Sequence, residues 1–152
     1  MSSTVRLPDG QLVTALRRRF DPQAFGEEFN WIDAYGSSDE GRSWQFLSRV
    51  TYTDLGGRNG NPPCLLRLRS GALCVTYAVR SVPYRVCARL SQNGGRSWGP
   101  EIVLREDGRN WDLGYTRSVQ RADGQVVTVY YFTTAEHPEQ HIAATIWDPS
   151  AL

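Results

Sequence analysis

The stretch Ser37-Ser38-Asp39-Glu40-Gly41-Arg42-Ser43-Trp44 decides the fold, because it returns fifty-four residues later as Ser91-Gln92-Asn93-Gly94-Gly95-Arg96-Ser97-Trp98. Both copies fit the pattern Ser-x-Asp/Asn-x-Gly-x-Ser-Trp. A short Asp or Asn side chain accepts hydrogen bonds from backbone N–H groups just after it, and Gly supplies the positive φ that a tight turn needs. The Trp is expected to pack back over its own turn. Two such turns at a fixed spacing predict a structural repeat.

A second unit repeats as well, and it consists of a strand, a tight turn and another strand. Each copy places Asp-Gly or Ser-Gly between two apolar runs, which is a strong signal for a β-hairpin. The copies lie at residues 6–14, 68–76 and 121–128. Their glycines are 61 and 53 residues apart. A period near 50 residues is within the range of propeller-type arrays.

The chain is therefore expected to be all-β, with no segment of helical period. We predict one domain of about three antiparallel sheets, covering approximately residues 1–55, 56–110 and 111–152. After the first hairpin, the expected strands of the first sheet are 12–16, 31–35 and 45–52. Those of the second sheet are 64–68, 73–79, 84–90 and 101–105. Those of the third are 117–120, 126–132 and 141–147, after which no fourth strand is expected.

Composition limits the classes of function. The 152 residues are 40% hydrophobic and 22% charged, which is typical of a globular domain. A net charge of +1 argues against a general nucleic-acid binder. No apolar run approaches the length of a membrane span, and no signal peptide is visible, so the compartment stays open. Cys64, Cys74 and Cys87 lie in apolar runs without metal-ligand spacing, and we expect buried thiols and no metal site.

The two octapeptides resemble the Asp-box, or bacterial neuraminidase repeat, of the sialidase superfamily. The resemblance rests on the fixed positions of both copies: Ser37, Asp39, Gly41, Trp44, Ser91, Asn93, Gly95 and Trp98. It implies a β-propeller in which four-stranded antiparallel blades form a ring of six, and this chain would supply about three blades of the C-terminal portion. In that family each box lies in the turn between the third and fourth strands of a blade, on the outer rim. The activity implied is exo-hydrolysis of a terminal sialic acid or a related acidic sugar, without a cofactor.

The same resemblance suggests site residues. In sialidases three arginines bind the substrate carboxylate, a tyrosine polarised by a glutamate is the nucleophile, and a loop aspartate is the acid/base. Tyr115 is similar to the nucleophile, and Glu28 is a weak candidate for its partner. The substrate-binding candidates stand before, or at the start of, expected innermost strands: Arg58, Asn61, Asp112 and Arg117. No residue matches the acid/base aspartate. Tyr115 can equally be an ordinary amphipathic aromatic, Arg58 a solvated turn residue and Asp112 a turn-forming aspartate.

Alternatives to a hydrolase remain open. The chain can also be a non-catalytic propeller that binds a glycan or a protein, or an inactive truncated fragment. Because closed propellers have about 4–8 blades, three sheets leave apolar faces without a partner. Either N-terminal blades of a longer protein or a second copy of the chain completes the ring.

Overall fold

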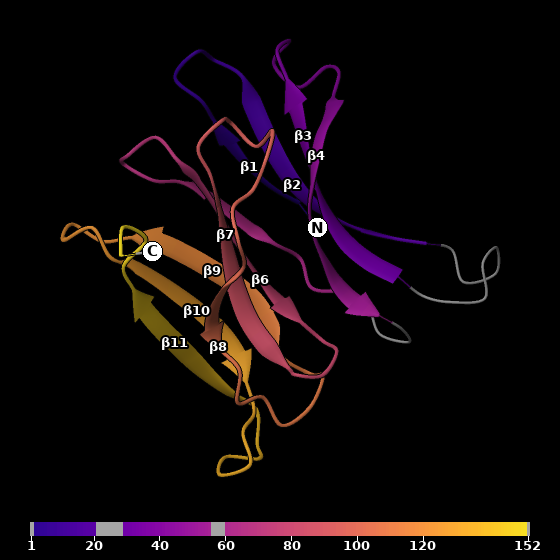
Figure 1. Ribbon diagram of the computed structural model, residues 1–152, viewed down its shortest axis with the longest axis vertical. Coiled ribbons are helices and arrows are strands. Elements are labelled where there is room, and N and C mark those ends of the chain that lie inside the picture. The colour runs from indigo at the N-terminus through magenta and orange to yellow at the C-terminus, as the bar shows by residue number, and fades with distance from the viewer. Residues whose placement is uncertain (1, 21–28, 56–59, 152) are drawn as a thin grey trace.

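The computed structural model describes residues 2–20, 29–55 and 60–151, and these residues form antiparallel β-sheets without a helix (Figure 1). The first sheet contains β1 (Ser2–Arg6), β2 (Leu12–Arg19), β3 (Phe29–Ser37) and β4 (Gln45–Leu55). The second contains β5 (Cys64–Arg67), β6 (Leu73–Val79), β7 (Arg85–Ser91) and β8 (Ile102–Arg105). The third contains β9 (Gly114–Gln120), β10 (Val126–Phe132) and β11 (His141–Trp147). No helix in the described ranges is long and apolar enough to cross a membrane.

The predicted all-β arrangement is confirmed, and several strands begin and end where the sequence places them. The bounds of β6, β10 and β11 agree with the prediction. β2 continues to Arg19, three residues further than predicted, because its ladder with β3 extends to the pair Arg19 and Asn30. β9 begins three residues earlier than predicted, because Gly114 pairs with Tyr131 beyond a bulge. The third sheet has three strands in the described chain, as its sequence predicts.

The three inner hairpins share one backbone geometry. Gly10, Gly71 and Gly124 have φ values of 88°, 93° and 97°, which only glycine adopts readily. In each hairpin the glycine N–H donates to the carbonyl three residues earlier. Each turn is flanked by a pair of residues at the same register: Arg6–Leu12, Arg67–Leu73 and Gln120–Val126. The hairpins therefore align the three sheets residue by residue.

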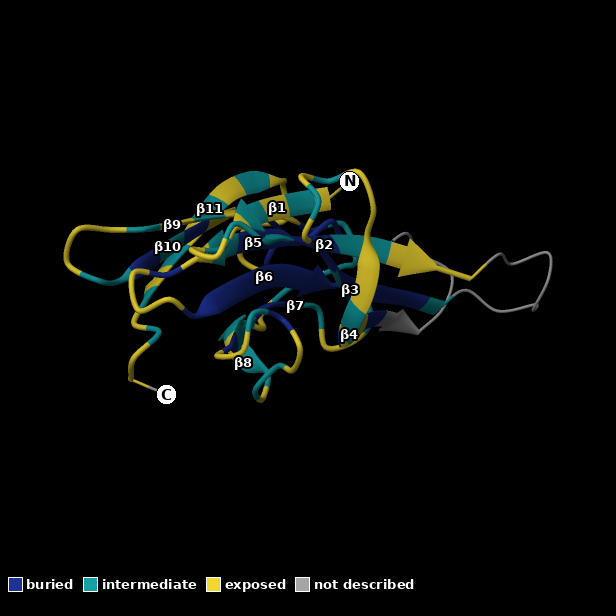
Figure 2. Cartoon of the chain, turned by 90° about the horizontal axis from the view of Figure 1, so that it is seen from above, coloured by how far each residue is buried: buried dark blue, intermediate teal, exposed yellow. Residues whose placement is uncertain are grey.

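The core lies between successive sheets, and β6 is at its centre. Every residue of β6 is buried, and Figure 2 shows this strand dark blue along its length. One cluster joins the first and second sheets, with Val13, Ile32, Val75 and Tyr77 among its members. Two further clusters join the second sheet to the third. All three cysteines are free and buried, as the apolar runs around them predict.

The two octapeptide turns have matching hydrogen bonds. The Asp39 Oδ1 accepts from the Ser43 N–H at 2.9 Å, and the Asn93 Oδ1 accepts from the Ser97 N–H at the same distance. In both turns the first serine hydroxyl accepts from the N–H of the glycine four residues later. Each indole packs over its own glycine, as predicted. The Trp98 indole N–H also donates to Ser48 of β4, so the second turn ties the first two sheets together.

The first turn should make stability depend on pH, whereas the second should not. Hydrogen bonds from the Ser43 hydroxyl and N–H lower the pKa of Asp39 from 3.8 to about 2. A lowered pKa contributes stability above pH 3.8 that is lost as the pH falls towards 2. We expect Asp39→Ala to lower the melting temperature at pH 7. Asp39→Asn, which copies Asn93, should keep it while removing this part of the acid dependence. Circular dichroism melts at pH 7 and pH 3 measure both effects, and equal melting of Asp39→Ala and wild type would contradict the expectation.

Candidate functional site

The beginnings of β5 and β9 meet the ends of β6 and β10 at one end of the second and third sheets. Asn61 fixes this end and is fully buried. Its amide NH₂ donates to the Leu113 carbonyl at 2.8 Å, and its carbonyl accepts from the Tyr115 N–H at 2.9 Å. Tyr115 has a φ of 53°, a region that costs a non-glycine residue of order 1 kcal/mol or more. The Asn61 bridge holds the backbone in this conformation, in which the Tyr115 side chain is 42% exposed.

Arg80 follows β6 and places a nearly buried guanidinium beside this bridge. Its Nε donates to the Leu113 carbonyl at 3.2 Å, and its Nη2 donates to the Tyr131 hydroxyl at 2.7 Å. The guanidinium carbon lies 5.6 Å from the ring centroid of Trp111 and 5.8 Å from that of Tyr115. A cation this close to two aromatic rings is attracted by their negative faces. Arg80 therefore orders both rings and the tyrosine hydroxyl together.

Tyr131 links the guanidinium to a carboxylate. Its hydroxyl donates to the Asp112 Oδ1 at 2.8 Å, and Gln140 donates to the Asp112 Oδ2. Burial, followed by the hydrogen bond to Asp112, raises the pKa of Tyr131 to about 12. The phenol is therefore neutral at pH 7 and serves as a hydrogen-bond donor. The rings of Tyr131 and Tyr115 lie 5.7 Å apart and are tilted by 36°.

We call Asn61, Arg80, Asp112, Tyr115 and Tyr131 the Tyr131 cluster. It brings together one exposed aromatic ring, one carboxylate, one phenol and one guanidinium, each oriented by at least one hydrogen bond or ring contact. Such a set can cover an apolar ligand surface with the ring and exchange hydrogen bonds with polar groups around it. Among the described residues no group of three or more His, Cys, Asp or Glu is placed to hold a metal ion.

The residues predicted from the sequence are distributed unevenly. Asn61, Asp112 and Tyr115 come together in the Tyr131 cluster. Arg117 lies two residues along β9 from Tyr115, is exposed, and donates to the carbonyl of Thr116 at 3.0 Å. The candidates Arg58 and Glu28 lie outside the described residues. The assignment of each residue to catalysis or binding stays a prediction.

Two members of the cluster were not predicted, and only one left a signal in the sequence. Arg80 follows seven buried residues of β6, and a charge directly after a largely apolar strand indicates the end of a sheet. Tyr131 stands in an ordinary run of β-branched and aromatic residues, where nothing distinguishes it from a packing residue. Trp111 and Gln140, which contact Arg80 and Asp112, were also not predicted.

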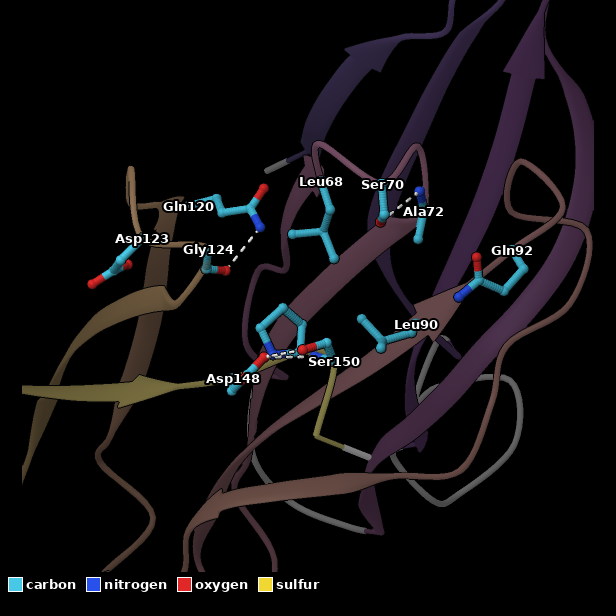
Figure 3. A pocket seen from close by; sticks show the side chains of 11 residues that line it. Leu68, Ser70, Ala72, Leu90, Gln92, Gln120, Asp123, Gly124, Asp148 and Ser150 are labelled. Carbon is cyan, nitrogen blue, oxygen red and sulfur yellow. Dashed lines mark hydrogen bonds between the residues drawn. The ribbon is translucent and has the colours of Figure 1, made fainter.

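A cavity of about 340 Å³ lies at the opposite end of the same two sheets, beside their hairpin turns (Figure 3). Several of the polar groups that line it bond to one another. The Asp148 Oδ1 accepts from the Ser150 N–H and hydroxyl, and Gln120 donates to the Gly124 carbonyl, as Figure 3 shows. Of the predicted catalytic residues, Tyr115 is the one that the structure describes, and it does not line this cavity. The Tyr131 cluster is therefore the better candidate.

Comparison with known proteins identifies the fold. No family model matches the chain, and no curated protein matches it. A protein of unknown function from Dyadobacter fermentans is 30% identical, with a TM-score of 0.71 over 97% of this chain and 37% of its own. An α-L-arabinanase from Penicillium chrysogenum, solved with arabinobiose, is 18% identical, with a TM-score of 0.69 over 97% and 45%. A Hadza microbial sialidase is 16% identical, with a TM-score of 0.59 over 95% and 34%.

The fold is an incomplete β-propeller. Its three sheets correspond to three blades. The chain spans less than half the length of each of these three structures. At 18% and 16% identity, the likeness to the arabinanase and the sialidase concerns the fold alone.

Proposed function

We propose that this chain is a segment of a glycan-active β-propeller and that it binds a sugar at the Tyr131 cluster. One observation carries the proposal: the exposed Tyr115 ring lies beside a phenol held between Arg80 and the Asp112 carboxylate. A sugar presents a C–H face and a rim of hydroxyl groups. The ring fits the first, and the carboxylate and phenol fit the second. The arabinobiose in the similar arabinanase structure supports a glycan as the ligand.

For the reaction, we propose exo-hydrolysis of a terminal sugar by the complete propeller, with sialic acid or a related acidic sugar as the substrate. Tyr115 is the proposed nucleophile and Glu28 its weaker candidate partner, while Arg58 and Arg117 contact the carboxylate. This choice rests on the resemblance to the sialidase superfamily, which is supported by the two octapeptide turns, since they make the side-chain hydrogen bonds that the sequence predicts. Because no residue is assigned as the acid/base, we expect a single, monomeric copy of the chain to bind sugar without turnover.

The second candidate is a propeller that binds glycan without catalysis. It is supported by the lack of an assigned acid/base residue, because the Tyr115 ring and the Asp112 carboxylate can contact a sugar without one. A fluorogenic sialoside separates the two candidates. Turnover that is abolished in Tyr115→Phe supports the hydrolase, whereas sugar binding without turnover by the complete propeller supports the second candidate.

The binding proposal has a direct test with a matched control. We expect Asp112→Asn and Tyr115→Ala each to weaken glycan binding by about tenfold or more, equivalent to about 1.4 kcal/mol. Asp123→Asn makes the same chemical change at the opposite-end cavity and should leave binding unchanged. Titration with arabinobiose and with sialic acid, followed by NMR, measures the affinities and identifies the preferred sugar. Unchanged binding in both site variants, or equal weakening in Asp123→Asn, overturns the proposal.

A further inference from the structure

The shared register of the three sheets allows each residue to be matched with its counterparts in the other two. One row of paired residues runs across the first sheet through Ser3, Ala15 and Ala34. The corresponding row of the second sheet is Cys64, Thr76 and Ala88. In the third sheet it is Arg117, Val129 and Ala144. The side chains of each row point to the same face of their sheet, the face towards the next sheet along the chain.

The central residues of this forward face are buried in the first two sheets, whereas their counterparts in the third sheet are exposed. Ile32 and Val86 are 0% exposed, whereas their counterpart Ile142 is 75% exposed. Ala15 is 0% exposed, whereas its counterpart Val129 is 37% exposed. Figure 2 shows the alternation of exposed and half-buried residues along β11. The third sheet thus presents Val and Ile side chains where the other two sheets carry a neighbour.

The first sheet is uncovered on its backward face, which we define as the face that in the other two sheets packs against the preceding sheet. Tyr77 of the second sheet and Tyr130 of the third point backward and are buried against the preceding sheet. Their counterpart Leu16 lines an open groove of about 440 Å³ instead. The other residues along this groove are polar or aromatic: Ser2, Thr4, Thr14, Arg18, Tyr35 and Trp44. The chain therefore carries one unoccupied face of each kind, at opposite ends.

We propose that a second copy of this chain seats its first sheet on the third sheet of the first copy, and that the reciprocal contact closes a two-fold ring of six sheets. The chain spans 45% of the arabinanase chain and 34% of the sialidase chain, so two copies together correspond to most of the length of either chain. A head-to-tail contact forms a closed ring when the rotation between copies closes on itself. Three sheets per copy require a half turn.

The two internal interfaces predict which residues meet at the new contact. At the first interface the Ser3 hydroxyl accepts from the Leu65 N–H at 2.9 Å. At the second, Cys64 accepts from the Ser118 N–H at 3.3 Å, and Cys64 and Ser118 are the counterparts of Ser3 and Leu65. The same pairing at the third interface places Thr4 of the second copy against Arg117.

A further bond at the second interface adds a neighbouring pair. The Thr76 and Ser118 hydroxyls lie 2.8 Å apart. Their counterparts are Val129 and Thr4. Val129 of one copy should therefore lie within disulfide reach of residue 4 of the other once both are cysteine.

The contact also reaches the Tyr131 cluster, a consequence that rests on the proposed function. Phe132 packs in one buried cluster with Ala78 and Val86 of the preceding sheet. The counterpart of Phe132 is Arg18, and that of Ala78 is Tyr131. The second copy thus brings an exposed guanidinium to the tyrosine that contacts Asp112, where it adds a positive group to the sugar site. Dimer formation is measured without sugar, so failure of the sugar site and failure of the dimer are distinguishable.

Sedimentation equilibrium tests the assembly. We expect a wild-type dimer in the micromolar range, and Val129→Glu or Ile142→Glu should raise the dimer dissociation constant by about 30-fold or more. The control Val103→Glu changes a residue that is also exposed, on β8 outside both open faces, and should remain dimeric. Circular dichroism checks that each variant folds.

Mixing two variants tests the head-to-tail geometry. Leu16→Glu alone should also be monomeric, but a mixture with Val129→Glu should recover heterodimers, because one of the two contacts then has two wild-type faces. Mixed Val129→Cys and Thr4→Cys chains should form a covalent dimer under oxidation, while either variant alone should not. The native cysteines are buried in the folded chain, so we expect them not to form disulfides that compete with the introduced pair.

Three results overturn the proposal. A wild-type monomer throughout the micromolar range means that other sheets, and not a second copy, cover these faces. A Leu16→Glu dimer indicates that two third sheets pack on each other. Absence of the Val129–Thr4 cross-link in a dimer that forms places the contact elsewhere.

Discussion

Asn61→Ala is expected to lower the free energy of unfolding by about 2–4 kcal/mol, which is large for a residue outside every strand. The side chain is fully buried and bridges the Leu113 carbonyl to the Tyr115 N–H. Arg80 still donates to that carbonyl in the variant, but the N–H loses the acceptor that Asn61 supplies. An unsatisfied buried donor costs about 1–3 kcal/mol, and the space left by the amide adds to this cost.

The same substitution should weaken sugar binding, because it releases the positive φ that directs the Tyr115 ring. Urea denaturation and the sugar titration measure the two effects on one variant. Asn110→Ala is the matched control: it also removes an amide, one that is only partly buried and accepts from the Asp112 N–H. We expect it to cost less than about 1 kcal/mol. Equal losses in the two variants would mean that the Asn61 bridge has no special role.

Tyr77→Ala should have the largest effect on stability, about 3–5 kcal/mol. Tyr77 is fully buried in the cluster between the first two sheets, and its hydroxyl donates to the Glu101 Oε2 at 2.7 Å. Tyr77→Phe keeps the ring and removes only this hydrogen bond, so we expect a loss of about 1–2 kcal/mol. The difference between the two variants measures the packing of the ring. If Tyr77→Ala loses no more stability than Tyr77→Phe, this description of the core is wrong.

The phenylalanine variant should also change the response to acid. Burial opposes ionisation of Glu101, but hydrogen bonds from Tyr77 and Arg85 outweigh it, so its pKa lies below the usual 4.5. A lowered pKa contributes stability above pH 4.5 that is lost as the pH falls through the folded-state pKa. Tyr77→Phe removes one of the groups that donate a hydrogen bond to Glu101. We therefore expect a shallower loss of stability below pH 4.5, measured by urea denaturation at several pH values.

Much of the fold could be predicted because its signals are local. The hairpin glycines and the octapeptides determine turns that each involve only a few neighbouring residues. β6 is an apolar run that is buried on both faces, and β10 alternates between buried and more exposed residues, as a strand with one buried face does. The extra residues of β2 and β9 depend on ladder partners and a bulge, which the strand's own sequence does not encode.

The candidate site was only partly predictable, because its contacts join distant segments. Asp112 and Tyr115 stand close together in the sequence before β9, and they were proposed as site residues on that basis. Tyr131 reaches Asp112 from 19 residues away, and Arg80 reaches Tyr131 from 51 residues away. Such pairs form only once two sheets have packed, so neither the residue type nor the spacing in the sequence predicts them. The clearest local signal for Arg80 was its position after a buried strand.

The buried cysteines make each sheet interface separately observable. Cys87 lies in the cluster between the first and second sheets, and Cys74 lies in a cluster between the second and third. Burial raises the pKa of both thiols and withholds them from reagents. Each thiol can therefore react with a disulfide reagent only when its own interface opens. Labelling rates of variants that retain one cysteine report how often each pair of blades separates in the native protein, without the introduction of a new cysteine.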